Sequence, residues 1–187
     1  MNIDFLTEQE IEQKAEEVLD KAYELEIYNK DQATPLELIT DHILCYNIVY
    51  ESLESHQRGV IGAIECESKI IWLDQSLDYQ KDELSAEGRH NFTLAHEIGH
   101  FVLHRNLGKD SEMRLFYNEN ELSKKRIEIQ ANLFASMLLM PRKLMLKKWN
   151  YCFSDILRQE HKIYEMMKFF RVSKQAMSIK LSSLNMI

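Results

Sequence analysis

Two histidines and one glutamate lie within the five-residue stretch HEIGH, at the spacing of a metal site. His96 and His100 are four residues apart, and Glu97 directly follows the first histidine. On an α-helix, residues four apart lie on the same face, so both imidazole rings can point a nitrogen at one ion. Glu97 would lie at the edge of that face, where its carboxylate can hold a metal-bound water. The spacing therefore predicts a zinc site that activates water.

A purely structural role is the alternative for these histidines, since a buried helix can contain hydrogen-bonded core histidines. The surrounding segment, RHNFTLAHEIGHFVLH, has the apolar pattern of a largely buried helix over about residues 90–105. Gly99 in its interior costs about 1 kcal/mol relative to alanine, which indicates that another helix approaches closely at this point. This context favours the zinc site over core histidines.

A catalytic zinc usually takes three protein ligands and leaves a fourth position for water. His104 continues the four-residue spacing, but one straight helix cannot easily place three of its residues round one ion. We therefore expect His104 to pack beside the site. The continuation H-x-x-G-x-x-H, which would supply a third histidine, is absent.

A glutamate from the following helix is the other source of a third ligand. Glu128 lies alone among apolar and small residues in RIEIQANLFASMLLMP. Asn132 follows one turn later and could orient a ligand through a hydrogen bond. Spacing leaves open the alternative that Glu128 is an exposed helix acid paired with Lys124 or Lys125.

The elements that must position these residues follow from the periodicity of the chain. EQEIEQKAEEVLDKAYELEI predicts an amphipathic helix whose apolar face comprises Ile11, Ala15, Val18, Leu19, Ala22 and Leu25. A second helix is expected to begin at TPLELITDHILCY, with Thr34 as N-cap and Pro35 at the first helical position. The segments YNIVYESLE, GVIGAIECE and SKIIWLD are short and rich in β-branched residues, so they predict a three-stranded meander.

The second half of the chain is predicted to be helical. A polar loop over 106–122 separates the histidine-bearing helix from a helix over about 123–140, which ends before Pro141. Residues 142–187 predict two or three short helices, and Met137, Met140 and Met145 are expected to fill the core. This order of elements indicates an α+β domain over residues 1–145, followed by a helical cap over 146–187.

The cap contains a segment, FFRVSKQAMSIKLSSL, that resembles the second half of a helix-turn-helix, with Val172–Ser173 at the turn and Ala176 packing inward. Residues 141–187 carry ten basic and three acidic residues, whereas residues 1–30 carry nine acidic and three basic ones. DNA contact by the cap is therefore conceivable. The net charge of −7 favours a cap over the core instead, and it argues against nucleic-acid binding by the whole surface.

Composition indicates an ordinary soluble globular protein, with 45% hydrophobic and 28% charged residues. Cys45, Cys66 and Cys152 are far apart and odd in number, which suits reduced thiols in a cytoplasm. The start, MNIDFLTEQEIEQK, lacks the basic and apolar regions of a signal peptide. No apolar run approaches the ~20 residues that a membrane span requires.

Two motifs together resemble the ImmA/IrrE family of bacterial and phage zinc metallopeptidases. In that family an F-T-x-A-H-E-x-G-H helix pairs with an E-x-x-A-N-x-F-A-x-x-L-L-M-P helix, and both patterns are present here without gaps. GAIECESKIIWLDQSL also resembles the family's strand pair, so the similarity covers roughly residues 35–145.

The resemblance implies an α+β, zincin-like fold that binds Zn²⁺. By this resemblance His96, His100 and Glu128 are the zinc ligands, and Glu97 is the general base or acid. Asn132 takes the place of a residue that hydrogen-bonds to a ligand. Members of the family often sit beside the repressor gene of a mobile element and cleave that repressor, or they act in stress regulation. The implied partner is thus a helix-turn-helix repressor.

An alternative from another class is a regulatory module in which zinc only holds helices together while the chain binds DNA or a protein partner. Glu97 argues against it, because a structural site needs no carboxylate beside the first histidine and is normally closed by a fourth ligand. If the chain is a peptidase, a tyrosine could stabilise the oxyanion. The candidates are Tyr46, Tyr50, Tyr79 and Tyr117, and nothing in the sequence selects one of them.

Overall fold

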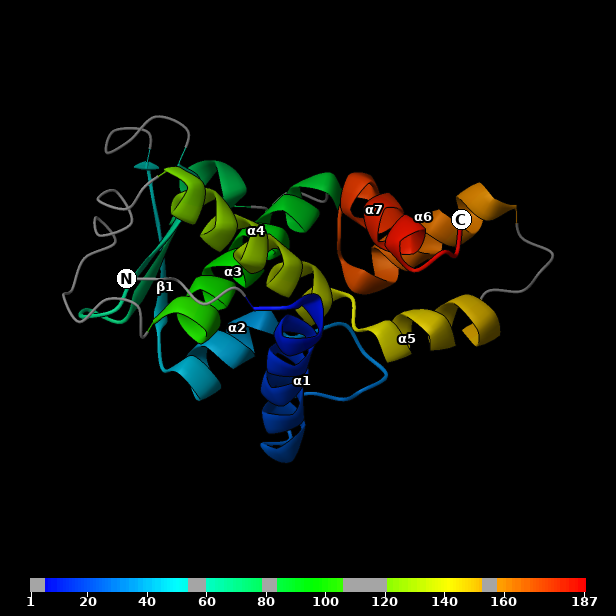
Figure 1. Cartoon of the computed structure of the whole chain (residues 1–187), viewed down its shortest axis with the longest axis horizontal. Helices are drawn as coiled ribbons and strands as arrows, with labels where there is room; N and C mark the ends of the chain where they lie inside the picture. Colours follow the sequence, from blue (N-terminus) through cyan, green and yellow to red (C-terminus); the bar gives the residue numbers. More distant parts are fainter. Residues whose placement is uncertain (1–5, 54–59, 79–83, 106–120, 153–157) are drawn as a thin grey trace.

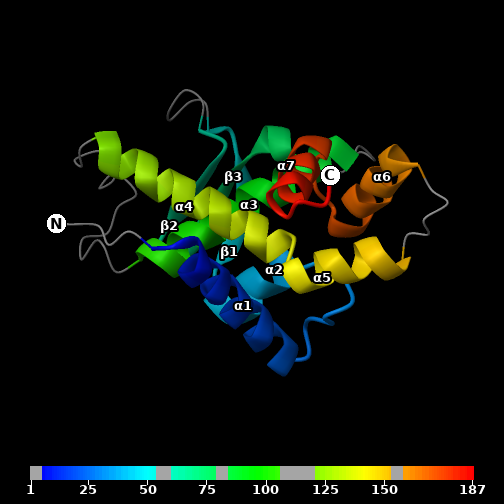
Figure 2. The ribbon, with the colours of Figure 1, turned by 45° about the vertical axis from the view of Figure 1, so that its right-hand side comes forward.

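Two long helices, α3 (Leu84–His104) and α4 (Glu121–Leu139), lie side by side at the centre of the protein, in green and yellow-green in Figure 1. This computed structural model describes residues 6–53, 60–78, 84–105, 121–152 and 158–187. Helix α1 (Glu8–Glu24) packs against α4, and a small mixed sheet packs against α3 (Figures 1 and 2). The predicted α+β class is confirmed.

Helix α1 forms as its sequence predicts. Thr7 is the N-cap: its hydroxyl accepts the N–H of Glu10, and the Glu10 carboxylate accepts the N–H of Thr7 in return. The buried residues are those of the predicted apolar face except Leu25, which lies beyond the end of the helix and is 47% exposed.

The second helix is shorter than expected and has a different cap. It comprises α2 (Leu36–Ile39) and the π-helical turn η1 (Thr40–Leu44), and its N-cap is Pro35. The prediction that Thr34 is the N-cap is wrong. The Thr34 hydroxyl instead donates to the backbone carbonyl of Leu138 in α4, at 2.8 Å. A tertiary hydrogen bond has replaced a local one.

The sheet contains β1 (Asn47–Glu51), β2 (Gly62–Glu65) and β3 (Ile70–Asp74) in the order β1-β3-β2. The predicted meander is wrong, because β1 pairs with β3 in parallel and only β2 and β3 are antiparallel. Ile71 and Leu73 of β3 are fully buried, so the most apolar strand takes the centre, where it has a partner on each side.

Helix α4 ends at Leu139, before Pro141 as predicted, and the chain continues through α5 (Arg142–Lys147) and the π-helical turn η5 (Lys148–Cys152). Two further helices follow, α6 (Gln159–Phe170) and α7 (Lys174–Ser183). The predicted turn at Val172–Ser173 is confirmed: Val172 is buried and Ser173 caps α7. Ala176 packs partly buried against the core. Met140 and Met145 are fully buried, as expected of core residues.

The α6–α7 pair packs against the first half of α3 (Figures 1 and 2). The side-chain amide of Asn91 donates to the backbone carbonyl of Arg171 at 3.0 Å. Gly88 lies directly against the backbone of Val172 and Ser173. The division of the chain at residue 145 stays a prediction. None of the helices in the described ranges is long and apolar enough to cross a membrane.

The acidic N-terminal part and the basic C-terminal part contact each other. Lys143 pairs with Glu16 at 3.0 Å, and Lys147 pairs with Asp31. Lys180 of α7 is buried, and desolvation lowers the pKa of its ammonium group although Glu12 and Glu8 act in the opposite direction. Part of the charge asymmetry seen in the sequence is therefore neutralised within the chain.

Replacing Gly88 by alanine is expected to destabilise the protein. A Cβ at this position would lie 2.7 Å from the backbone carbonyl carbon of Val172, so the α6–α7 turn must move. Overpacking of this kind costs about 1–3 kcal/mol, which outweighs the gain of about 1 kcal/mol that alanine brings to a helix. Urea unfolding measures the change, with Arg89→Ala on the exposed side of the same turn as control. A Gly88→Ala variant as stable as the Arg89→Ala variant would contradict this packing.

Candidate metal centre

Close packing of α4 on α3 brings the two halves of the site together. A Cβ built on Gly99 would lie 3.2 Å from the backbone oxygen and 3.3 Å from the Cα of Ala131. The predicted close approach of a helix at Gly99 is thus confirmed. Ala131 and Asn132 follow Glu128 by three and four residues, so all three lie on one side of α4. The contact at Gly99 therefore places Glu128 and Asn132 beside the histidines of α3.

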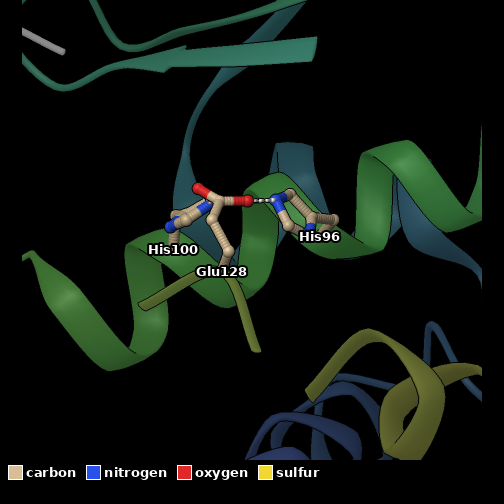
Figure 3. Close-up of side chains that lie close together, drawn as sticks. All are labelled: His96, His100 and Glu128. Atoms are coloured by element: carbon tan, nitrogen blue, oxygen red, sulfur yellow. Dashed lines mark hydrogen bonds and ion pairs between the residues drawn. The ribbon is translucent and has the colours of Figure 1, made fainter. Parts of the chain in front are cut away.

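Glu128 meets His96 and His100 in the structure (Figure 3). Its Oε2 lies 3.2 Å from Nε2 of His96, and its Oε1 lies 3.5 Å from Nε2 of His100. The two Nε2 atoms are 2.9 Å apart. Among the described residues, these three form the group of histidines and acids that could hold a metal ion, with ligand atoms all within 4.8 Å of one another.

These distances fit a tetrahedral ion. Zinc–nitrogen and zinc–oxygen bonds of about 2.0–2.1 Å correspond to about 3.4 Å between neighbouring ligand atoms of a tetrahedron. The three observed separations, 2.9, 3.2 and 3.5 Å, lie on either side of that value. Two imidazoles and one carboxylate also leave a fourth position open, as catalytic sites require.

Asn132 orients the first histidine. Its Oδ1 lies 3.0 Å from Nδ1 of His96. Because an amide oxygen only accepts hydrogen bonds, this contact requires the proton of a neutral His96 ring on Nδ1. The lone pair is then on Nε2, the nitrogen that faces Glu128 and His100. The structure therefore brings Asn132 to the position that its spacing from Glu128 predicted.

The charges in the group support one another. Hydrogen bonds to His100 and His96 hold the pKa of the Glu128 carboxyl far below its usual value. Burial alone would lower the pKa of His96, but the Glu128 and Glu97 carboxylates more than offset it, so this pKa is raised. Glu128 is therefore an ionised carboxylate that faces both rings, a geometry not expected of an ordinary solvent-exposed helix acid.

Glu97 is buried beside the group and does not belong to it. Only 6% of its surface is exposed, and burial raises the pKa of its carboxyl although His100 and His96 act to lower it. The carboxylate lies against Gly62 of β2. A carboxylate whose pKa is raised by burial is a stronger base than an exposed one, as a residue that accepts a proton from water requires.

His104 packs beside the site, as predicted. It is 3% exposed, its ring centroid lies 5.6 Å from that of His100, and its Nε2 lies 2.9 Å from Oε1 of Gln130. Burial lowers the pKa of its imidazole to about 4, so the ring is neutral. Gln130 was missed by the sequence analysis, although its spacing from Ile127 and Phe134 places it on the buried stripe of α4.

Two of the four tyrosines considered for stabilising the oxyanion, Tyr46 and Tyr50, lie within the described residues. Tyr46 is buried edge-on against Phe101 with ring centroids 5.1 Å apart, and burial raises the pKa of its hydroxyl. The Tyr50 hydroxyl lies 2.8 Å from Nε2 of His90. Tyr79 and Tyr117 lie outside the described residues. Neither His90 nor Phe101 is one of the three candidate ligands.

Comparison with known proteins bears on the identity of this site. The model of the family described as the IrrE N-terminal-like domain, Peptidase_M78, matches residues 48–182. Among solved structures, a Mycobacterium tuberculosis transcriptional regulator has a TM-score of 0.49 and 15% identity over 90% of this chain and 51% of its own. The chain thus spans about half the length of that regulator, and nothing about function follows from so distant a likeness.

No curated protein is similar enough to serve as a relative. The family match covers well over half of the chain and contains both helices of the metal centre. The chain belongs to the IrrE N-terminal-like domain family, which is the ImmA/IrrE family of metallopeptidases.

Proposed function

We propose that this protein is a zinc-dependent endopeptidase in which His96, His100 and Glu128 hold the zinc and Glu97 is the catalytic base. One observation carries the proposal: a buried carboxylate, that of Glu97, lies directly beside the three candidate metal ligands and is not itself a candidate ligand. Two imidazoles and one carboxylate suit zinc, which accepts nitrogen and oxygen ligands at tetrahedral geometry.

The residues divide the reaction between them. A bound zinc would polarise the scissile carbonyl and lower the pKa of the attacking water. The Glu97 carboxylate takes the proton of that water as the water attacks, and then passes it to the nitrogen of the leaving amine. Asn132 keeps the His96 ring turned so that Nε2 faces Glu128 and His100, where it would hold the zinc.

Within the described residues β2 is an edge strand, so a substrate in extended conformation can pair with it. The N–H of Asp74 donates to the carbonyl of Ile61 at 2.9 Å, which makes Gly62 and Leu73 a non-hydrogen-bonded pair of the antiparallel ladder. The N–H and C=O of Gly62, and by the same register those of Ile64, therefore face away from β3. A peptide strand gains main-chain hydrogen bonds by pairing with such an edge.

The partner that we propose is a helix-turn-helix repressor encoded nearby, cut once so that its DNA-binding and oligomerising parts separate. The support is the family, together with cysteines that suit a cytoplasm, where indiscriminate proteolysis would be harmful. Docking by charge adds specificity. The exposed Lys168, Arg171 and Lys174 are the basic residues that we assign to docking. Lys168 lies 3.4 Å from Glu165 and Arg171 lies 3.7 Å from Glu87, so a docked partner would compete with these two surface ion pairs.

Incubation with candidate repressors tests the function directly. The protein should produce one cut in the correct repressor, located by mass spectrometry, and the cut should require zinc and Glu97. A stable complex without cleavage, formed under inducing conditions with zinc bound, would favour the alternative of a zinc-stabilised binding module.

Replacing Asn132 by alanine is expected to weaken zinc binding about 10–100-fold, because loss of a residue that orients a metal-bound histidine has effects of this size. Competition with a zinc chelator measures the affinity. Asn132→Asp retains the acceptor oxygen and should bind nearly as tightly as the wild type. Lys125→Ala, an exposed substitution on the same helix, is the control. Equal affinities for Asn132→Ala and wild type would show that this hydrogen bond does not orient His96.

A further inference from the structure

One row of residues crosses the sheet above the face of α3 that carries Glu97. Leu73 of β3 pairs with Tyr50 of β1 on one side and with Gly62 of β2 on the other. Residues in one row project to the same face of a sheet. The Tyr50 hydroxyl reaches His90, so this face is the one that packs on α3.

Gly62 is the residue of this row that contacts Thr93 and Glu97 of α3. A Cβ built on Gly62 would lie 2.5 Å from Cγ2 of Thr93, 2.8 Å from Oε1 of Glu97 and 3.3 Å from Cγ of Glu97. The backbone of β2 therefore lies directly against the Glu97 carboxylate, with no room for a methyl group. This contact accounts for part of the burial of Glu97.

The backbone of Gly62 also faces the edge of the sheet that β2 forms in the described part of the chain. The N–H and C=O of Gly62 point away from β3, because Gly62 and Leu73 are a non-hydrogen-bonded pair. A peptide that pairs with β2 would therefore be held by the backbone of the residue that contacts Glu97. Gly62 alone would then set the distance between the substrate main chain and the Glu97 carboxylate.

We propose that Gly62 is a positioning residue, whose missing side chain holds the Glu97 carboxylate and the substrate-binding edge of β2 at their working separation. The expected effect on kcat rests on the proposed peptidase function. The expected contact between Gly62 and Glu97 does not depend on that function. The φ of Gly62 lies outside the left-handed region, so its role comes from close approach of the helix and not from backbone conformation.

Gly62→Ala is the test. The new methyl group displaces either the Glu97 carboxylate, which ends a flexible side chain, or the edge of β2. Misplacement of a reacting group by about 1 Å can cost about 100-fold. We therefore expect kcat for repressor cleavage to fall roughly 100-fold, with one zinc per chain and an unchanged zinc affinity. A crystal structure should show the carboxylate or the edge of β2 displaced from its wild-type place.

The double variant Gly62→Ala with Thr93→Ser separates positioning from packing. Serine lacks the Cγ2 atom nearest to the new methyl group, so the double variant should regain the thermal stability that Gly62→Ala loses. It should not regain kcat, because the contact with Glu97 remains. Thr93→Ser alone is the control and should cleave as the wild type does. Recovery of kcat together with stability would show that Gly62 serves packing alone and would overturn the proposal.

A crystal structure of the Gly62→Ala variant tests the geometry without any substrate. A Glu97 carboxylate and a β2 edge that both superpose on the wild type would overturn the proposal, whether or not a repressor is ever cleaved. Failure of the proposed function has a different signature, namely zinc-loaded wild-type protein that cuts none of the candidate repressors.

Discussion

A Glu97→Gln variant is expected to bind zinc, to fold, and to leave its substrate uncut. Glutamine has the size and shape of glutamate, and Glu97 is not one of the three convergent ligands, so the metal centre should persist. The amide cannot take the proton of the attacking water. General base catalysis contributes about 10²–10⁴-fold, so cleavage should fall by at least this much.

Thermal stability supplies an internal control for this variant. Glu97 is buried, and burial raises the pKa of its carboxyl because a charged carboxylate loses solvation there. The neutral amide escapes this penalty, and the melting temperature at pH 7 should not fall. Glu87→Gln, at the start of the same helix, should leave cleavage intact. Retained proteolysis in the Glu97→Gln variant would show that the base lies elsewhere.

Glu128→Ala is expected to remove most of the zinc affinity. Among the described residues, Glu128 is the carboxylate that faces both His96 and His100, so the variant keeps two of the three candidate ligands, both on one helix. The loss should exceed the roughly 10–100-fold effect expected from altering only a residue that orients a ligand. Elemental analysis of protein purified without chelators should find one zinc per chain in the wild type and little in the variant.

Chelation measures the same effect through stability. A ligand that binds only the folded state adds about 4 kcal/mol when it is present at 1,000 times its dissociation constant. EDTA should therefore lower the melting temperature of the wild type and leave that of Glu128→Ala nearly unchanged. Lys125→Ala should respond as the wild type does. If substitution of Glu112 or Glu119, both outside the described residues, removes the zinc instead, Glu128 is not the third ligand.

Features that depend on local spacing could be read from the sequence. Because residues four apart on a helix lie on one face, the separation of His96 and His100 places both on one face whatever the rest of the chain does. The buried face of α1 and the turn at Val172–Ser173 are local in the same sense. Gly99 was informative because a glycine inside an apolar helix is unfavourable unless something packs against it.

Tertiary structure decided which segments meet. Spacing did not distinguish Glu128 from an ordinary surface acid, and the packing of α4 on Gly99 brings it to the histidines. The order β1-β3-β2 replaced the expected meander because a strand's sequence reports its buried face and not its neighbours. The contact between Gly62 and Glu97 joins residues 35 positions apart on different elements, so no local pattern marks it. Periodicity encodes the faces of helices and strands, whereas the pairing of those faces depends on how the whole chain buries its apolar surface.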